Sequence, residues 1–387
     1  METKRVIIKD RDHICEEELK EAAAILREGG LVAFPTETVY GLGGNALDEN
    51  AARKIYAAKG RPSDNPLIAH VSCPEEVAPL VKEIPEAGRR LMEAFWPGPL
   101  TMIFPKSGIV PYGTTGGLDT VAIRMPDDPV ASRLIALAGI PIAAPSANTS
   151  GRPSPTTADH VWQDMNGRID MVIDGGPVGI GVESTIVDVS SKIPAVLRPG
   201  AITMEMLRDV LGEVAMDPAI LGPLSPDIRP KAPGMKYKHY APKADLTLVE
   251  PKEMETGRDT GDADGVDDMD EMGDLDGVGD TDDMDEAQIK RMVDKVRELA
   301  GARIEDGFKV GIICTDESMS CYPQGLVRTI GARKSQASVA HNLYALLREF
   351  DDLNVDYIVS ESFPKDHLGQ AIMNRLSKAA GYKIIKV

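Results

Sequence analysis

Cysteine and aromatic side chains are scarce in this 387-residue chain, which has four cysteines and 4% aromatic residues. No Cys-x-x-Cys pair occurs, so the sequence indicates neither a zinc site nor a disulfide framework. We expect the cysteines to be reduced thiols, as they are in cytoplasmic proteins.

Long apolar segments are missing as well. The first nine residues, METKRVIIK, contain basic side chains but no apolar stretch of signal-peptide length. No uninterrupted apolar run reaches the roughly 18 residues that a membrane-spanning helix needs. We therefore expect a cytoplasmic protein that has no membrane partner.

The net charge of -18 is concentrated in one segment. Residues 253–286 hold 16 acidic residues and one basic residue, whereas the rest of the chain holds 45 acidic and 42 basic residues. The Gly-rich composition of this segment predicts disorder. Asp262 and Asp264 resemble the start of a calcium loop, but the required spacing is not met, so a solvated spacer is favoured. The remaining charge predicts no broad nucleic-acid surface and does not exclude a basic cleft.

Helical and strand patterns alternate over the first 200 residues. Residues 16–28 have the apolar spacing of an amphipathic helix, which Gly29 and Gly30 end before the apolar run 31–34. This alternation predicts the α/β class. Further helices are expected at 51–59, 85–95, 129–138, 157–165 and 203–211, and strands at 67–71, 100–104, 120–124, 140–144, 171–173, 185–189 and 195–197.

The length of the chain favours two domains. After a first domain at 1–215, residues 216–244 are rich in Pro, Leu and Lys without clear periodicity, which is typical of a linker. Residues 245–387 then read as a small α/β domain of nucleotide-fold character that contains the acidic segment. Its strands are expected at 246–250, 309–313, 357–360 and 383–387, and its helices from 287 and at 335–350 and 370–380.

Polar side chains follow the strand at 31–34. The segment PTETVYGLG (35–43) places two hydroxyls, a carboxylate and a phenol where open α/β sheets usually bind ligands. A ligand loop is favoured over a polar turn that caps the next element.

A second cluster begins with Lys59 at a helix end and continues with Arg61, Asn65 and His70. Lysine and arginine suit a polyphosphate, although a cation at a helix end also complements the helix dipole. His70 alone is more often a structural histidine. The P-loop pattern is absent here, so any phosphate must be held mainly by side chains.

Thr120 and Arg124 lie four residues apart on one expected strand, so they share a face. A buried arginine must meet a negative partner, which is either an internal carboxylate or an anionic ligand. The sequence leaves both possibilities open.

Small residues between 142 and 155 deliver Ser146, Asn148 and Ser154, and they let a ligand approach the backbone closely. Because no Gly-x-Ser-x-Gly elbow occurs, covalent serine catalysis is not favoured. A last cluster combines the hydroxyls near Ser184 with Arg198. Many hydroxyls and cations with few acid/base groups indicate positioning and charge stabilisation, as phosphoryl or nucleotidyl transfer requires.

Seven motifs occur in an ordered series: PTETVYGL (35–42), KGRPSDNPL (59–67), WPGPLT (96–101), RMP (124–126), APSAN (144–148), STI (184–186) and LRPG (197–200). With this series the chain resembles the threonylcarbamoyl-AMP synthase family. The resemblance implies a YrdC-like twisted open mixed sheet with helices. The linker sequence PGMKYKHYAP (233–242) resembles the long form of the family, which implies a second, small Rossmann-like α/β domain.

The resemblance further implies a nucleotidyltransferase that condenses L-threonine, bicarbonate and ATP into threonylcarbamoyl-AMP and pyrophosphate, with Mg²⁺ accompanying ATP. The product would then pass to a downstream threonylcarbamoyl transferase complex that modifies ANN-decoding tRNAs. Direct tRNA binding is left open.

Site residues are implied in the same way. The threonine pocket would consist of Thr38, His70, Arg124, Ala144 and Ser184. The ATP contacts would be Lys59, Arg61, Asn65, Thr120, Ser146, Asn148, Ser154, Arg198, Tyr237, His239 and Tyr240. Lys59, Arg61 and Ser146 are expected to be catalytic, no protein side chain is assigned as a direct metal ligand, and the linker trio would form a lid.

Two other functions compete with this interpretation. A non-catalytic RNA-binding protein is expected to have more basic charge and more aromatic stacking motifs than this chain contains. A carbamoyltransferase of hydrogenase maturation is expected to contain zinc-finger segments. The absence of Cys-x-x-Cys pairs from this chain argues against that function.

Overall fold

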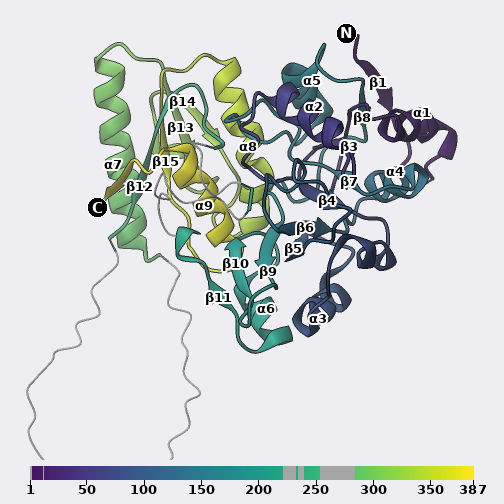
Figure 1. Cartoon of the computed structure of the whole chain (residues 1–387). Coiled ribbons are helices and arrows are strands. Elements are labelled where there is room, and N and C mark those ends of the chain that lie inside the picture. Colours follow the sequence, from purple (N-terminus) through teal and green to yellow (C-terminus); the bar gives the residue numbers. More distant parts are fainter. Residues whose placement is uncertain (1, 12, 221–231, 234–238, 253–283) are drawn as a thin grey trace, which may run out of the picture.

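The computed structural model describes residues 2–11, 13–220, 232–233, 239–252 and 284–387. Two α/β domains lie side by side, the first in purple to teal and the second in green to yellow (Figure 1). The predicted lid residue Tyr237 and residues 253–283 of the acidic segment lie outside these ranges.

The first domain is built around an eleven-stranded sheet in the order β1-β8-β2-β3-β7-β4-β6-β5-β9-β10-β11. Its pairings are both parallel, as in β4 with β6, and antiparallel, as in β4 with β7. The expected mixed sheet is therefore confirmed. The strands are β1 (Lys4–Ile7), β2 (Val32–Phe34), β3 (Gly41–Asn45), β4 (Ile68–His70), β5 (Leu100–Pro105), β6 (Thr120–Arg124), β7 (Ile142–Ala143), β8 (Met171–Asp174), β9 (Thr185–Asp188), β10 (Ala195–Arg198) and β11 (Ala215–Met216).

Helices cover both faces of this sheet. Along β2, Val32 and Phe34 join one apolar cluster with α1 and α4, whereas Ala33 joins another that includes side chains of α2 and α5, as the period of two in a strand requires. The helices are α1 (Glu16–Arg27), α2 (Glu49–Lys59), α3 (Glu86–Phe95), α4 (Pro129–Ala138), α5 (Ala158–Met165) and α6 (Met204–Leu211), with short 3-10 turns at Pro74–Glu76, Ala78–Leu80 and Pro218–Ile220.

The second domain has a five-stranded, all-parallel sheet in the order β14-β13-β15-β12-β16. It keeps the layered, parallel character expected of a Rossmann-like domain, although β15 lies between β13 and β12, which a simple Rossmann order would make neighbours. Its elements are β12 (Asp245–Glu250), α7 (Glu286–Glu305), β13 (Val310–Cys314), β14 (Leu326–Thr329), α8 (Gln336–Asp352), β15 (Tyr357–Glu361), α9 (Gly369–Ala379) and β16 (Ile384–Lys386), with a 3-10 turn at Met319–Cys321.

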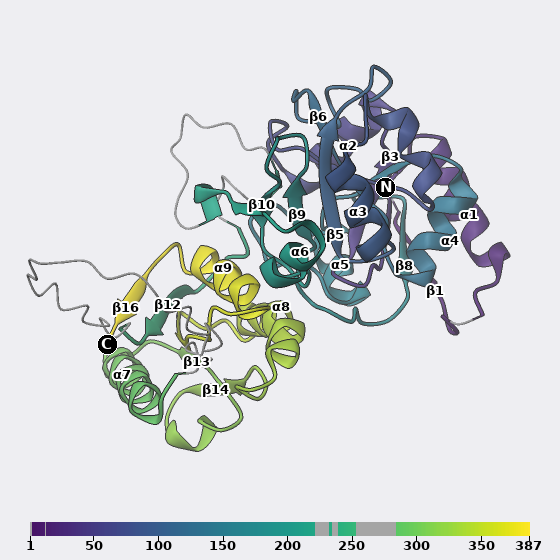
Figure 2. The ribbon, with the colours of Figure 1, turned by 90° about the horizontal axis from the view of Figure 1, so that it is seen from below.

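Helices α8 and α9 face the first domain, and α7 lies on the far side of the second sheet (Figures 1 and 2). Val39 and Val182 of the first domain belong to the same buried cluster as Leu343 of α8. Gly181 adopts a φ of 89°, and a Cβ there would lie 2.5 Å from Cα of His341. The two domains therefore share an apolar core, and only glycine fits this close approach.

The start of α7 refines one expected boundary. Asp285 caps this helix in a capping box with Gln288, so the last two residues of the predicted acidic segment initiate the helix. All four cysteines are free, as expected. In the ranges that the structure describes, no helix has the length and apolarity needed to cross a membrane.

Candidate active site

One pocket lies where loops from the first sheet meet the end of the linker. The predicted residues that line it are Thr38, Arg61, His70, Arg124, Ala144, Ser146, Asn148, Ser154, Ser184, Arg198, His239 and Tyr240. Lys59, Asn65 and Thr120 are not among the lining residues. The fold thus brings together most of the residues that the sequence singled out.

Arg124 ends β6 and is 4% exposed. Its Nη1 donates to Thr38 Oγ1 at 2.9 Å, and its Nη2 lies 2.6 Å from Glu37 Oε1. This contact is an ion pair without hydrogen-bond geometry. Neither oxygen of Glu37 accepts a hydrogen bond from any of the described residues. The internal carboxylate that the sequence left as one alternative is therefore Glu37.

His70 ends β4 beside Arg124, to which it is register-paired. Its Nδ1 lies 3.1 Å from the carbonyl of Ile68. Burial, reinforced by the charge of Arg124, lowers the pKa of His70 to about 3. The imidazole is therefore neutral at physiological pH and adds no positive charge to the pocket.

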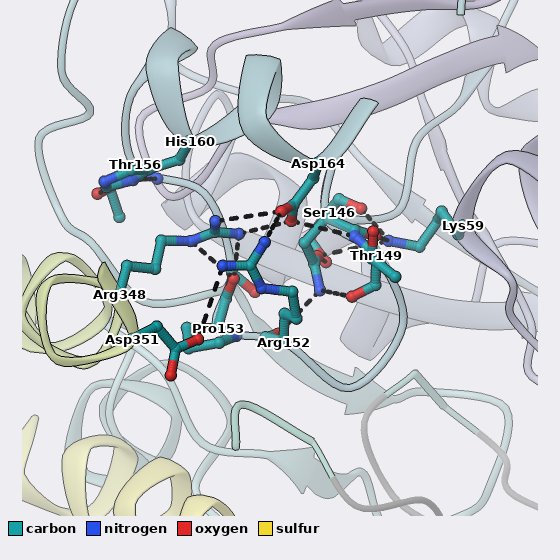
Figure 3. A network of polar contacts seen from close by, with 12 residues as sticks. Lys59, Ser146, Thr149, Arg152, Pro153, Thr156, His160, Asp164, Arg348 and Asp351 are labelled. Atoms are coloured by element: carbon teal, nitrogen blue, oxygen red, sulfur yellow. Dashed lines mark hydrogen bonds and ion pairs between the residues drawn. The ribbon is translucent and has the colours of Figure 1, made fainter. Parts of the chain in front are cut away.

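Lys59 is the last residue of α2, where Gly60 ends the helix with a φ of 60°. Its buried Nζ donates to the carbonyl oxygens of Ser146 and, at 2.7 Å, of Asn148 (Figure 3). Burial, followed by the charge of Arg61, lowers the pKa of Lys59 well below its ordinary value. In this structure Lys59 holds the backbone of the β7–α5 loop, residues 144–157, and does not line the pocket.

Arg61 is a buried cation of the pocket wall. Its Nη2 donates to the carbonyl oxygens of Asn65 (3.2 Å) and Pro66 (3.0 Å), while its Nε has no partner among the described residues. Burial lowers its pKa to about 10, so the side chain stays charged at neutral pH. An incompletely paired buried guanidinium is suited to an anionic ligand.

Thr120 lies at the start of β6, whereas Arg124 lies at its end. The two share a face of the strand, but four residues of rise separate them by about 13 Å. Thr120 and Arg124 therefore share a face of β6, but only Arg124 lines the pocket. Asn65 contributes its backbone carbonyl to Tyr56 and Arg61.

The β7–α5 loop supplies the hydroxyl-rich wall of the pocket. Ser146 Oγ donates to Asn148 Oδ1 at 2.6 Å, and Ser154 Oγ donates to Glu183 Oε1 at 2.6 Å. On the opposite strands, Arg198 donates to the carbonyl and hydroxyl oxygens of Ser184 at 3.0 and 3.1 Å. The side chains that would contact a ligand are therefore already oriented by one another.

Glu183 is a pocket residue that the sequence analysis missed. It accepts hydrogen bonds from Ser154, from the hydroxyl of Tyr344 (2.9 Å) and from Nε of Arg375 (3.1 Å). Burial opposes its ionisation, but the charges of Arg375 and Arg198 outweigh burial and lower the pKa to about 2. Tyr344 and Arg375 belong to the second domain, so no local signal could have revealed this arrangement.

The end of the linker closes one side of the pocket. Tyr240 has a φ of 64° and stacks on Tyr344 with ring centroids 5.2 Å apart. Burial, then the charge of Arg61, lowers the pKa of the neighbouring His239 to about 3. Tyr240 is therefore held by a residue of the second domain, and the ring of His239 lies against Tyr240 with centroids 5.5 Å apart.

No group of three or more His, Cys, Asp or Glu side chains in the described part of the chain is arranged to hold a metal ion. The one carboxylate among the lining residues, Glu183, is occupied by Ser154, Tyr344 and Arg375. Hydroxyl and amide oxygens remain, at Ser146 and Asn148.

The chain is similar to characterised sequences over nearly its whole length. Residues 24–200 match the family described as "Telomere recombination", and residues 202–381 match "Threonylcarbamoyl-AMP synthase, C-terminal domain". A threonylcarbamoyl-AMP synthase of Pyrococcus abyssi is 46% identical over 99% of both chains, and one of Bacillus subtilis is 43% identical over 100% of both.

Solved structures agree with the sequence comparisons. P. abyssi Sua5 in complex with L-threonine superposes with a TM-score of 0.84 and 43% identity, covering 100% of each chain. The similarity includes both domains and the linker between them. The chain belongs to the threonylcarbamoyl-AMP synthase family, in its two-domain form.

Proposed function

We propose that the protein condenses L-threonine, bicarbonate and ATP into threonylcarbamoyl-AMP and pyrophosphate, which makes it a nucleotidyltransferase. The observation that carries this proposal is a single pocket that joins a carboxylate-binding arginine, Arg124, to two further buried cations and a hydroxyl-rich loop. Full-length relatives with this activity in their names support it.

The threonine subsite is proposed around Arg124. Its guanidinium pairs with the substrate carboxylate, and Thr38, which already accepts from Nη1, fixes the orientation of the fork. Ser184 supplies a hydroxyl, and Ala144 leaves room for the substrate backbone. Neutral His70 contributes a hydrogen bond without repelling the substrate ammonium.

The nucleotide subsite is proposed along Arg61, Arg198 and the β7–α5 loop. The two guanidinium groups neutralise phosphate charge, and Ser146, Asn148 and Ser154 donate to or accept from the nucleotide. Lys59 supports this subsite by holding the loop carbonyls. Asn65 and Thr120 stay predicted ATP contacts that would need a rearrangement to reach the pocket, and Tyr237 lies outside the described residues.

The reaction has two bond-forming steps. The threonine ammonium first releases a proton to solvent, and the free amine then attacks the bicarbonate carbon to give a carbamate with loss of water. A carbamate oxygen then attacks the α-phosphorus, and the bond to pyrophosphate breaks on the opposite side. Arg61 and Arg198 stabilise the negative charge of this transition state, while His239 and Tyr240 shield the mixed anhydride from water.

Mg²⁺ is proposed to enter with the phosphates of ATP. Because Glu183 is bonded to three side chains, the oxygens of Ser146 and Asn148 are proposed for the metal side of the nucleotide, where they would exchange their mutual hydrogen bond for the ion. When bound, the ion would neutralise phosphate charge. The adenylate would then serve a transferase complex acting on tRNA, in the cytoplasm.

The test is pyrophosphate release from ATP and Mg²⁺ with threonine or bicarbonate withheld in turn. We expect release only when both are present. Arg61→Ala should lower kcat/KM by about 100-fold, the scale of removing one transition-state charge contact. Arg53→Ala, an exposed arginine on α2, is the control. Turnover of ATP without either co-substrate, or tight tRNA binding with no turnover, would contradict the proposal.

A further inference from the structure

The second domain inserts a buried arginine into the wall of the first. Arg348 lies on α8 and is 1% exposed. Its Nη2 and Nε donate to the carbonyl of Pro153 at 2.6 and 3.1 Å, and Nη2 also donates to Asp164 Oδ2 at 2.8 Å. Pro153 lies in the β7–α5 loop and Asp164 lies on α5, so Arg348 joins both to the other domain (Figure 3).

Asp164 is the centre of a buried charge network. Besides Arg348, it pairs with Arg152 and accepts from the backbone N–H of Thr149 at 3.1 Å. Asp351, one turn along α8 from Arg348, lies 3.6 Å from Nη2 of Arg152. Each domain thus contributes one cation and one anion, and the signs alternate around the network. Such a network fixes its members strongly because an unpaired charge cannot remain buried.

This network holds a segment that has no regular secondary structure of its own. The β7–α5 loop connects a two-residue strand to α5, and it carries the pocket residues Ser146, Asn148 and Ser154. Lys59 anchors the carbonyls of Ser146 and Asn148, Asp164 anchors the N–H of Thr149 in the middle of the loop, and Arg348 anchors the carbonyl of Pro153 toward its end. Of these anchors, Arg348 alone comes from the second domain.

We propose that Arg348 is a positioning residue for the nucleotide, and that the second domain completes the ATP side of the pocket through it. Arginine suits this role because its planar fork can hold a carbonyl and a carboxylate together, which an ammonium cannot reproduce. The inference rests on the proposed function, because it assigns the β7–α5 loop to ATP. Arg348 touches no pocket surface itself, so its effect is transmitted through residues 149–154.

The experiment compares Arg348→Met with Arg328→Met in the full-length chain. Arg328 is the matched control because it also pairs with a residue of α8, Glu349, but contacts only the second domain. We expect Arg348→Met to raise the KM for ATP by about 10-fold or more and to leave the KM for threonine within about twofold. Hydrogen exchange of the amides at 149–152 and 154 should accelerate about 10-fold or more, with the central strands of both sheets unchanged.

Arg348→Lys keeps a cation for Asp164 and guards against failure of the methionine variant to fold. It should show the same ATP-selective change at a smaller size. An equal rise of both KM values with faster exchange throughout both domains would overturn the proposal, and so would an unchanged KM for ATP with unchanged loop exchange. Failure of the proposed function would be recognised separately, because the wild-type protein would then release no pyrophosphate. The comparison of hydrogen exchange in the Arg348 and Arg328 variants would still show whether Arg348 holds the β7–α5 loop.

Discussion

At the residue scale, the main feature of the pocket is that Arg124 already has an anionic neighbour. Glu37 Oε1 forms an ion pair with its Nη2 at 2.6 Å. The geometry is not that of a hydrogen bond, and the carboxylate accepts no hydrogen bond from any of the described residues. In the proposed function, a substrate carboxylate would therefore share Arg124 with Glu37. The contacts with Glu37 and Thr38 also fix the orientation of the Arg124 guanidinium.

This pairing allows binding and stability to be separated. Arg124→Gln should abolish the response to threonine and should lower the free energy of unfolding by about 3–5 kcal/mol, because it leaves Glu37 buried without a counter-ion. The double variant Glu37→Gln/Arg124→Gln removes both charges and should recover most of the stability without recovering threonine binding. Urea unfolding and equilibrium titrations with threonine and ATP measure both effects. Equal loss of threonine and ATP binding would count against a carboxylate clamp.

Sequence motifs identified individual pocket residues well but could not supply their partners. Thr38, Arg124 and Ser146 stand in short motifs that end strands, so their positions in the chain predict a common edge of the sheet. Glu183 is positioned by Arg375, which lies 192 residues away in the sequence. Arg348 is positioned by its contact with Pro153, which lies 195 residues away. No local spacing encodes a contact of that separation.

At the element scale, β3 shows where local propensity misleads. Its sequence, GLGGN, is poor in strand-forming residues, so the sequence predicted a ligand loop through residue 43. The strand forms because glycine is the residue that fits between its neighbours. A Cβ on Gly43 would lie 2.7 Å from Phe34 Cε1 and 2.9 Å from Ile142 Cγ2. β1 and β14, which the sequence analysis also missed, are short strands at sheet edges.

Gly43→Ala tests this packing argument. The added methyl group cannot be accommodated without moving the side chains of two flanking strands, and overpacking of this kind costs about 1–3 kcal/mol. Gly108→Ala is the control, because no atom lies within 4 Å of the position its Cβ would take. We expect urea unfolding to show the loss for Gly43→Ala and a change within about 0.5 kcal/mol for Gly108→Ala. Equal effects of the two changes would show that crowding at β3 is not the cause.

At the scale of the whole molecule, the second domain supports the walls of the pocket. Helix α7 lies on the side of the second domain that faces away from the first domain (Figure 2). The opposite side, formed by α8 and α9, carries Tyr344, Arg348 and Arg375 into contact with the pocket walls. The shared apolar core favours unfolding of both domains together.

Buried histidines make the stability of this whole unit depend on pH. Burial lowers the pKa of His70 and His239 to about 3 in the folded chain, whereas an unfolded histidine has a pKa of about 6.5. Between these values the unfolded state binds protons that the folded state excludes, so the stability contributed by these two neutral histidines is fully present above the unfolded pKa of about 6.5 and is lost as the pH falls toward 3. Near pH 5 each of the two should contribute a slope of up to about 1.4 kcal/mol per pH unit.

Urea unfolding at pH 7, 6 and 5 tests this linkage. His239→Gln should reduce the slope of stability between pH 6 and 5 by about one proton equivalent, because glutamine cannot be protonated in the unfolded chain. His13→Gln is the matched control, since the side chain of His13 is 85% exposed. Glu183 does not change this slope, because its pKa is lowered from 4.5 to about 2. Its effect on the pH dependence of stability therefore lies mainly below pH 4.5. A slope that is the same in His239→Gln as in the wild type would show that His239 binds its proton as readily in the folded chain as in the unfolded chain, and it would contradict the prediction of a neutral buried imidazole at the end of the linker.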